Sequence, residues 1–188
     1  MRLFVALDIP EDVRAELGAF AAKLRITCPN ARWARIEGLH VTLKFVGETS
    51  EDKAKMVKSA LADIPSRAPI SIGFRGFGFF PNARRPRALW AGVEAGPELG
   101  ELAAAVDIAL EAPGIPREER AFSPHLTLAR FDEPRGLETL HAAIEKIGSL
   151  EFGTTIAKEF HLYESVLKRG GAEYTRLASF SFAGGKSG

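Results

Sequence analysis

Two short segments hold the residue types most able to carry out chemistry. Residues 40–43 read His-Val-Thr-Leu and residues 125–128 read His-Leu-Thr-Leu, in a chain with only four histidines. Successive side chains of a β-strand point to opposite faces, so His and Thr would share one face and the aliphatic residues the other. Each segment therefore predicts a strand with a buried apolar face and a face that offers an imidazole beside a hydroxyl.

Two such histidines could serve one reaction, because the ordinary pKa of histidine, about 6.5, lies near working pH. A neutral imidazole accepts a proton and a protonated one donates it. Phosphodiester hydrolysis needs a base for the attacking water and an acid for the leaving oxygen, on opposite sides of phosphorus. Thr42 and Thr127 would donate hydrogen bonds to the non-bridging oxygens, which carry charge in the transition state.

Metal binding is the competing interpretation of the histidines. Two histidines without a third His, a Cys or a carboxylate nearby make an incomplete zinc site. His141 falls in a helical pattern and His161 in a strand pattern beside Phe160, and neither completes such a set. A single His-x-Thr segment would be read as structural, but a pair in equivalent positions favours acid–base catalysis without a metal.

Four further residues are candidates for substrate contact. Arg130 lies three residues after Thr127 and would face away from it in a regular strand, unless a bulge or the strand end turns it to the site. Lys44 has the parity of His40 and could point inward. Trp33 and Tyr174 could stack on a nucleobase, and packing in the core or at its rim is the alternative for both.

The predicted elements occur twice in the same order. Strand, helix, motif strand, helix and strand run from Leu3 to Phe77 and again from Leu89 to about Leu162. The motif histidines lie 85 residues apart, and residues 4–8 align with 90–94 at an offset of 86. This agreement favours an internal duplication. We expect helices over 11–25, 49–63, 99–110 and 137–147, and strands over 3–7, 32–36, 40–46, 70–80, 88–94, 125–131, 156–167 and 174–182.

These elements predict an α+β fold in a single domain over residues 1–188. Glycine- and phenylalanine-rich hairpins favour antiparallel sheets. We expect a bilobal, pseudo-twofold arrangement in which two antiparallel sheets face a central cleft and the helices lie on the outer faces. Each lobe would hold about one motif, and the tail at 183–188 is expected to be flexible.

Composition limits the classes of partner. The hydrophobic fraction is 46% and the charged fraction 26%, as in ordinary globular proteins, and the net charge is only +1. This charge argues against a long duplex-binding surface, although not against a local site for one or two phosphates. Cys28 is the single cysteine, which excludes an internal disulfide. No signal peptide and no apolar run of about 20 residues is present, so we expect no membrane partner. The single cysteine suits a reducing cytoplasm, which is the location we expect, and we expect a monomer.

At these residues the chain resembles a known family. The segments RLFVALDIP, LHVTLKFVGE, LWAGVE and AFSPHLTLAR are similar to those of RNA 2′,3′-cyclic phosphodiesterases, also called 2′-5′ RNA ligases, in the two-histidine phosphoesterase superfamily. The resemblance extends to Glu164, Ser165 and Tyr174. Gly38 and Val41 depart from the usual pattern, but neither departure removes a catalytic atom.

The resemblance implies metal- and cofactor-free hydrolysis of a 2′,3′-cyclic phosphate, on RNA ends or nucleotides, to a 2′-phosphomonoester. It implies that His125 is the general base and His40 the general acid, roles that symmetry alone leaves interchangeable. Thr42 and Thr127 would hold the phosphate with help from Arg130. It also implies a capacity for ATP-independent 2′-5′ RNA ligation.

Two alternatives stay open from the sequence. In the first, the same residues bind a nucleotide or RNA without hydrolysing it. In the second, the enzyme acts on another cyclic ester, such as ADP-ribose 1″,2″-cyclic phosphate.

Overall fold

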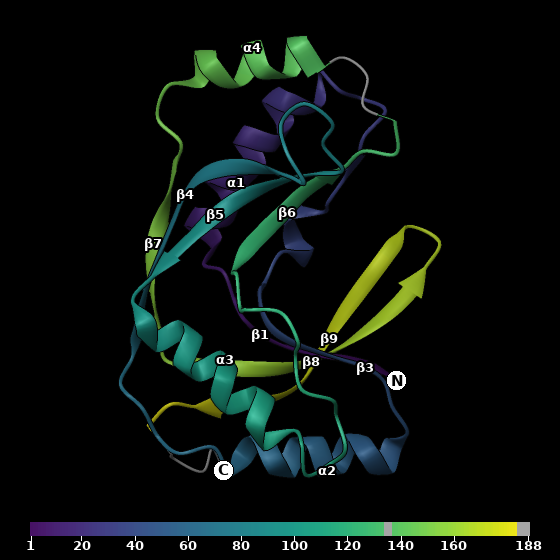
Figure 1. Ribbon diagram of the computed structural model, residues 1–188, viewed down its shortest axis with the longest axis vertical. Helices are drawn as coiled ribbons and strands as arrows, with labels where there is room; N and C mark the ends of the chain where they lie inside the picture. The colour runs from purple at the N-terminus through teal and green to yellow at the C-terminus, as the bar shows by residue number, and fades with distance from the viewer. Residues whose placement is uncertain (134–136, 184–188) are drawn as a thin grey trace.

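Within the residues that the structure describes, the fold consists of two antiparallel sheets and four helices (Figure 1). This computed structural model describes residues 1–133 and 137–183. Residues 184–188, which belong to the tail expected to be flexible, lie outside the described residues. The α+β class and the two antiparallel sheets expected from the sequence are confirmed.

The first sheet has four strands in the order β3-β1-β8-β9, each antiparallel to its neighbour. It contains the first motif, because β3 begins directly after His40. Its strands are β1 (Arg2–Leu7), β3 (Val41–Glu48), β8 (Glu159–Lys168) and β9 (Gly171–Ser181).

The second sheet has five strands in the order β2-β6-β5-β4-β7, also antiparallel, and contains the second motif at the start of β6. Its strands are β2 (Arg32–Trp33), β4 (Ile70–Phe80), β5 (Ala88–Ala95), β6 (His125–Arg130) and β7 (Glu151–Ala157).

The helices are α1 (Glu11–Arg25), α2 (Glu51–Ala62), α3 (Pro97–Ala109) and α4 (Leu137–Ile147), with a 3-10 turn η1 (Ile36–Gly38). In Figure 1, α1 and α4 lie at one end of the molecule and α2 and α3 at the other. α1 packs on β7 and α4, and α3 packs on β3 and α2. Within the described ranges, none of the helices combines the length and the apolar character that crossing a bilayer requires.

Local sequence explains where the helices begin and which face they bury. The Ser50 hydroxyl accepts a hydrogen bond from the Lys53 backbone N–H and so caps α2. Pro97 occupies the first turn of α3, where its missing N–H costs nothing. In α1, Val13 and Leu17 belong to an apolar stripe that is buried against the sheet side of the core.

Two expected strands differ from the observed ones. The run expected as one strand over 156–167 is two strands, β7 and β8, which lie in different sheets and meet at Lys158. No glycine or proline marks this crossing, so the sequence pattern runs through it unbroken. The strand expected over 32–36 ends at Trp33, because η1 follows it.

The two motif strands share one irregularity. In β3, Thr42 pairs with Ala6 and Lys44 pairs with Val5, so Leu43 has no partner in the register. In β6, Leu128 is skipped in the same way between Thr127 and Ala129. A bulge of this kind reverses the alternation of side chains beyond it. Both motifs therefore present His and Thr as a regular strand would, and only the residues after them change face.

Candidate active site

Both motifs turn their aliphatic residues inward and leave His and Thr on the other face. Val41 and Leu43 are buried in the core, whereas Thr42 is half-buried. Leu126 and Leu128 are likewise buried, and Thr127 is half-buried. The alternation predicted from the sequence is therefore present in both motif segments.

The two imidazoles are held in the same way. His40 Nδ1 lies 3.0 Å from the carbonyl oxygen of Gly38, and His125 Nδ1 lies 2.9 Å from that of Ser123. A carbonyl oxygen only accepts hydrogen bonds, so Nδ1 carries the hydrogen and donates it. Each neutral ring then leaves its lone pair on Nε2, the atom available to exchange a proton with a substrate.

His40 lies in a crowded environment. Its Nε2 is 3.6 Å from Asp8 Oδ1, and its ring contacts the rings of Phe4 and Tyr163. Burial lowers the pKa of His40; the hydrogen bond to Gly38 and the negative charge of Asp8 oppose that shift, whereas the charge of Arg14 adds to it. Asp8 therefore favours the protonated form of a ring that burial alone would keep neutral.

Asp8 is itself the centre of a polar cluster that the sequence did not reveal. Its carboxylate accepts hydrogen bonds from the Tyr163 hydroxyl and the Arg176 guanidinium, and lies 3.5 Å from His161 Nε2. Burial and the bond to Asp8 raise the pKa of Tyr163 to about 12. Asp8 directly follows β1, and the other groups come from β8 and β9. The adjacency of these strands cannot be read from spacing along the chain.

His125 lies in a more open environment than His40. Its side chain is exposed, and the nearest aromatic ring is that of Trp90, 6.5 Å away between centroids. Trp90 lies over Gly78, where an added Cβ would come 2.0 Å from Trp90 Cζ2. Glycine at that position is therefore what lets the indole lie flat on β4.

Arg130 lies on the face of its sheet that carries Thr127. Beyond the bulge at Leu128, Arg130 pairs with Ala88, which has the same parity as Trp90, the partner of Thr127. The bulge considered from the sequence is thus present, and the exposed Arg130 side chain shares a face with the motif. Its contact with a phosphate stays a prediction.

Lys44 does not lie on the face of the sheet that carries His40 and Thr42, so its assignment as a substrate contact is wrong. The bulge at Leu43 pairs Lys44 with Val5 and turns it to the core face, where it is only 3% exposed. Its ammonium lies 2.7 Å from Asp107 Oδ1, donates to the Pro116 carbonyl at 2.7 Å and lies 3.3 Å from Glu118. It therefore ties β3 to α3 and to the segment that leads to His125.

The two candidate aromatic residues have different places. Trp33 packs partly buried against the core, and its indole N–H donates to the Cys28 carbonyl at 2.9 Å. This placement supports the packing alternative for Trp33. Tyr174 instead lies beside the site, with its ring centroid 5.7 Å from that of His40.

The chain path limits how far apart the two motifs can lie. Ala34 donates its backbone N–H to the Leu128 carbonyl at 2.8 Å, next to the second motif. Six residues later the chain reaches His40, and six extended residues span at most about 20 Å. η1 shortens that path further. β2, the edge strand that pairs with β6, thus leads through η1 to the first motif, and β6 holds the second motif.

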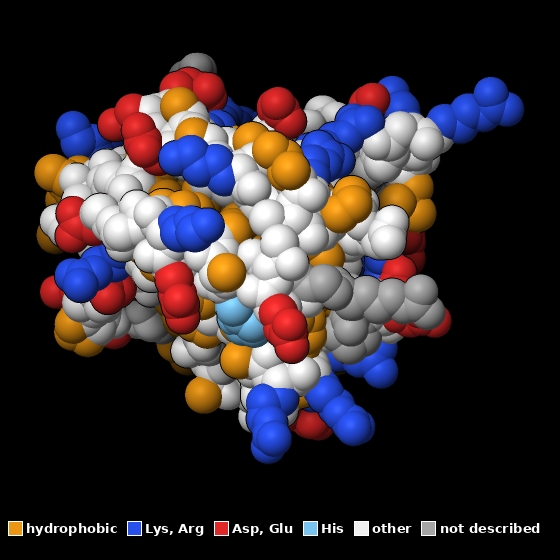
Figure 2. Space-filling view, turned by 90° about the horizontal axis from the view of Figure 1, so that it is seen from above, with side chains coloured by type: hydrophobic (Ala, Val, Ile, Leu, Met, Phe, Trp, Pro, Cys, Tyr) orange, Lys and Arg blue, Asp and Glu red, His pale blue; other side chains and the backbone are white. Residues whose placement is uncertain are grey.

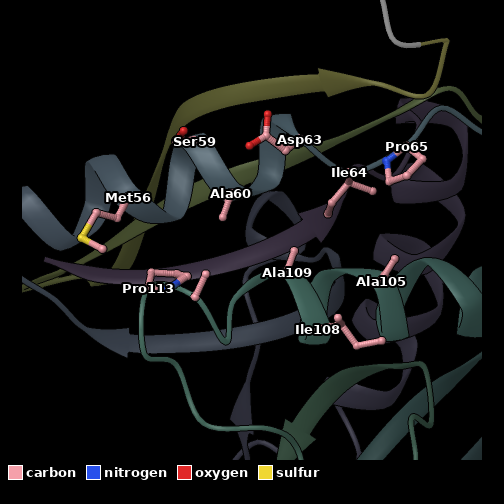
Figure 3. A pocket seen from close by; sticks show the side chains of 11 residues that line it. Met56, Ser59, Ala60, Asp63, Ile64, Pro65, Ala105, Ile108, Ala109 and Pro113 are labelled. Carbon is pink, nitrogen blue, oxygen red and sulfur yellow. The ribbon is translucent and has the colours of Figure 1, made fainter.

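No group of three or more His, Cys, Asp or Glu side chains in residues 1–133 and 137–183 is placed to hold a metal ion. A hollow of about 700 Å³ between α2 and α3 is lined mainly by apolar side chains and contains neither motif (Figure 3). Figure 2 shows basic and acidic side chains interleaved over the α4 end, without a continuous basic surface.

Comparisons of the sequence with known proteins identify its relatives. The sequence profile of the 2′-5′ RNA ligase superfamily matches residues 9–168. The RNA 2′,3′-cyclic phosphodiesterase of Methanothermobacter thermautotrophicus is 32% identical over 181 residues, covering 96% of this chain and 98% of that protein. A Thermus thermophilus protein of the same name is 36% identical over 195 residues, covering 98% and 91%.

Solved structures share the whole fold. The crystal structure of the Thermus thermophilus protein TT0787 superposes with a TM-score of 0.79 at 32% identity, covering 97% of this chain and 98% of that one. Escherichia coli LigT in complex with 3′-AMP superposes with a TM-score of 0.77 at 27% identity, covering 96% and 97%.

Proposed function

This chain belongs to the 2′-5′ RNA ligase superfamily, and from that premise we propose that it is an RNA 2′,3′-cyclic phosphodiesterase that works by paired histidine acid–base catalysis. Relatives of that name match over nearly their full length. The observation that carries the mechanism is the shared orientation of the motif rings. Each donates Nδ1–H to the carbonyl two residues earlier and keeps Nε2 for the substrate.

In the proposed reaction His125 Nε2 takes a proton from water as the water oxygen attacks phosphorus. The bond from phosphorus to the ribose 3′-oxygen breaks on the opposite side. His40 Nε2–H donates its proton to that oxygen, so a 2′-phosphomonoester and a free 3′-hydroxyl result. One proton enters His125 and one leaves His40, and exchange with solvent restores both rings.

The asymmetry between the two rings supports this division of roles. An acid must be protonated before it acts, and the Asp8 carboxylate 3.6 Å from His40 Nε2 favours that form. The anionic phosphate of a bound substrate acts in the same direction. His125 has no carboxylate among its described contacts and is open to solvent, where an attacking water can reach it.

Three side chains would stabilise the phosphoryl oxygens. Thr42 and Thr127 lie two residues after the histidines on the same faces and can donate from their hydroxyls. Arg130 shares the Thr127 face through the bulge. Donors fixed in this way act most strongly on the charge that develops in the transition state.

We also propose that the fold contains two repeated units within one domain. β3 pairs with β1 as β6 pairs with β5, and each motif strand skips the leucine that follows its threonine. Such repeats would place one histidine on each side of a shared phosphate. A monomeric state, a cytoplasmic location and 2′-5′ ligation activity stay predictions.

Hydrolysis of 2′,3′-cyclic AMP by the wild type and two variants tests the function. His40→Ala and His125→Ala should each lower kcat by about 100-fold or more, the usual scale for one acid–base group. His141→Ala, in α4, is the matched control and should keep full turnover. Near-normal turnover by both motif variants would contradict the mechanism. Tight binding of 2′-AMP without any turnover would indicate a binding module. Faster turnover of ADP-ribose 1″,2″-cyclic phosphate than of 2′,3′-cyclic AMP would indicate that the enzyme acts on a different cyclic ester.

A further inference from the structure

A buried cation joins the strand of the first motif to the chain that leads to the second. Lys44 lies in β3, two residues after Thr42, and is 3% exposed. Its ammonium lies 2.7 Å from Asp107 Oδ1 and 3.3 Å from Glu118 Oε1, and donates to the Pro116 carbonyl at 2.7 Å. These three acceptor groups match in number the three N–H donors of an ammonium. Lys44 therefore has no donor left over for a substrate.

The fold of the motif strand does not itself require a charge at this place. In β6, the residue that follows the bulge as Lys44 does in β3 is Ala129, which is 1% exposed. The second motif thus has a small apolar side chain at the same place. Replacing a buried ion pair by apolar side chains of similar volume is often neutral or stabilising. Neither the bulge nor stability alone therefore explains a lysine here.

Two partners of Lys44, Pro116 and Glu118, lie in the chain between α3 and β6, residues 110–124, which we call the connecting segment (Figure 1). Asp107, in α3, holds the same part of this segment. Its two carboxylate oxygens lie 3.2 and 3.3 Å from the Glu118 backbone nitrogen, which donates to them. Lys44 from β3 and Asp107 from α3 therefore anchor the connecting segment together.

The far end of the connecting segment orients the second motif histidine. Residues 119–121 are exposed, and Phe122 packs partly buried on the core. The Ser123 carbonyl then accepts the hydrogen bond from His125 Nδ1 at 2.9 Å. This bond keeps the hydrogen of a neutral ring on Nδ1 and the lone pair on Nε2. The orientation of the His125 ring therefore depends on where the connecting segment is held.

In-line displacement makes the relative position of the two histidines critical. His125 Nε2 must reach the attacking water while His40 Nε2 lies at the oxygen that leaves on the opposite side of phosphorus. The two rings belong to different sheets, so contacts between those parts of the fold set their relative position. A misplacement of about 1 Å can lower the rate about 100-fold. This requirement rests on the proposed function.

We propose that Lys44 is a positioning residue that sets the second motif histidine against the first motif strand. It fixes the connecting segment, and through Ser123 the His125 ring, against β3. β3 carries Thr42 and directly follows His40. One face of β3 thus meets the substrate, while the other face holds the chain that orients the opposite histidine.

Steady-state hydrolysis of 2′,3′-cyclic AMP tests the proposal, at a temperature where circular dichroism shows every variant folded. Lys44→Met should lower kcat by about 10-fold to 100-fold, since a misplacement of about 1 Å can cost 100-fold. KM should not change, because Lys44 contacts no group proposed to bind the substrate. Arg117→Met is the matched control. Arg117 binds Asp107 and Glu111 at the α3 end of the connecting segment rather than β3, so its loss should leave kcat unchanged.

Proton–nitrogen NMR spectra of the imidazoles give a readout that needs no turnover. At a pH where the rings are neutral, they distinguish a ring with hydrogen on Nδ1 from one with hydrogen on Nε2. Both motif histidines of the wild type should show Nδ1–H. In Lys44→Met, His125 should show a mixture of the two forms, while His40 keeps Nδ1–H. Failure of the proposed function would leave this readout unaffected, because the wild type would then show the expected forms without turnover.

A double variant separates positioning from stability. Lys44→Met leaves the Asp107 carboxylate without its buried partner, whereas adding Asp107→Leu removes both charges and should raise the urea midpoint again. The kcat of the double variant should stay low, because nothing then holds the Pro116 carbonyl. Recovery of kcat together with stability would overturn the proposal. So would a normal kcat, a raised KM with normal kcat, or a His125 ring that keeps Nδ1–H in Lys44→Met.

Discussion

His40 and His125 make the same hydrogen bond, from Nδ1 to the carbonyl oxygen of the residue two positions earlier, at 3.0 and 2.9 Å. The two rings thus enter the site in one tautomer, although their surroundings differ. Asp8, Tyr163 and His161 surround His40, whereas His125 is exposed. This difference supports the separate roles proposed for the two histidines, which their equivalent positions in the motifs would leave interchangeable.

Asp8→Asn should move the pH dependence of kcat/KM. Asp8 opposes the lowering of the His40 pKa by burial, and the charges of Arg14 and His161 reinforce that lowering. Removing the carboxylate should therefore lower the pKa of His40 further. Because His40 is the proposed acid, activity should be lost as pH rises through that pKa, so the alkaline limb should shift to lower pH.

The matched control for Asp8→Asn is Glu94→Gln, at the position that aligns with Asp8 in the second half of the sequence. Glu94 is exposed and lies 3.6 Å from Arg75. Its replacement should leave both limbs in place. An alkaline limb that does not move in Asp8→Asn would show that Asp8 does not act on the catalytic proton.

Lys44→Met should destabilise the protein by about 3 kcal/mol or more, as expected when one partner of a buried ion pair is removed. Burial disfavours the negative charge of Asp107, but the hydrogen bond from Lys44 outweighs this and lowers the pKa of Asp107. Asp107 would lose that partner. Urea denaturation at neutral pH measures the change, with the exposed Lys58→Met in α2 as control. Equal midpoints for the two variants would show that the pair contributes nothing to stability.

The free energy of unfolding should fall as pH drops below about 6.5. Burial lowers the pKa of His161, which is 1% exposed, and of His40. In the unfolded chain the histidines have their ordinary pKa, so below about pH 6.5 the unfolded chain binds more protons than the folded protein does. The free energy of unfolding therefore falls as pH falls. Each such proton contributes up to about 1.4 kcal/mol per pH unit. Urea titrations at pH 7.5 and 5 should show a smaller difference in His161→Gln than in the wild type.

Site residues that lie within one strand could be predicted from the sequence, whereas residues brought together by pairing between strands could not. The His and Thr faces followed from alternation along β3 and β6. Lys44 was predicted on the wrong face because the sequence around Leu43 does not indicate a bulge. A bulge of the same kind places Arg130 on the face that carries Thr127. Asp8, Tyr163 and Arg176 meet only through the pairing of β1, β8 and β9, which depends on the whole fold.

Turnover should survive dialysis against EDTA. The proposed steps move protons between Nε2 atoms, water and a leaving oxygen, with charge stabilised by Thr42, Thr127 and Arg130. Initial rates on 2′,3′-cyclic AMP before and after chelation measure this. Loss of activity that returns with an added divalent cation would support the metal interpretation of the histidines.

The product formed from 2′,3′-cyclic AMP tests the central claim most directly. Phosphorus NMR or chromatography separates 2′-AMP from 3′-AMP after complete turnover. The proposed placement of His40 at the leaving 3′-oxygen and His125 at the attacking water predicts 2′-AMP as the single product. Formation of 3′-AMP, or no hydrolysis at all, would contradict it.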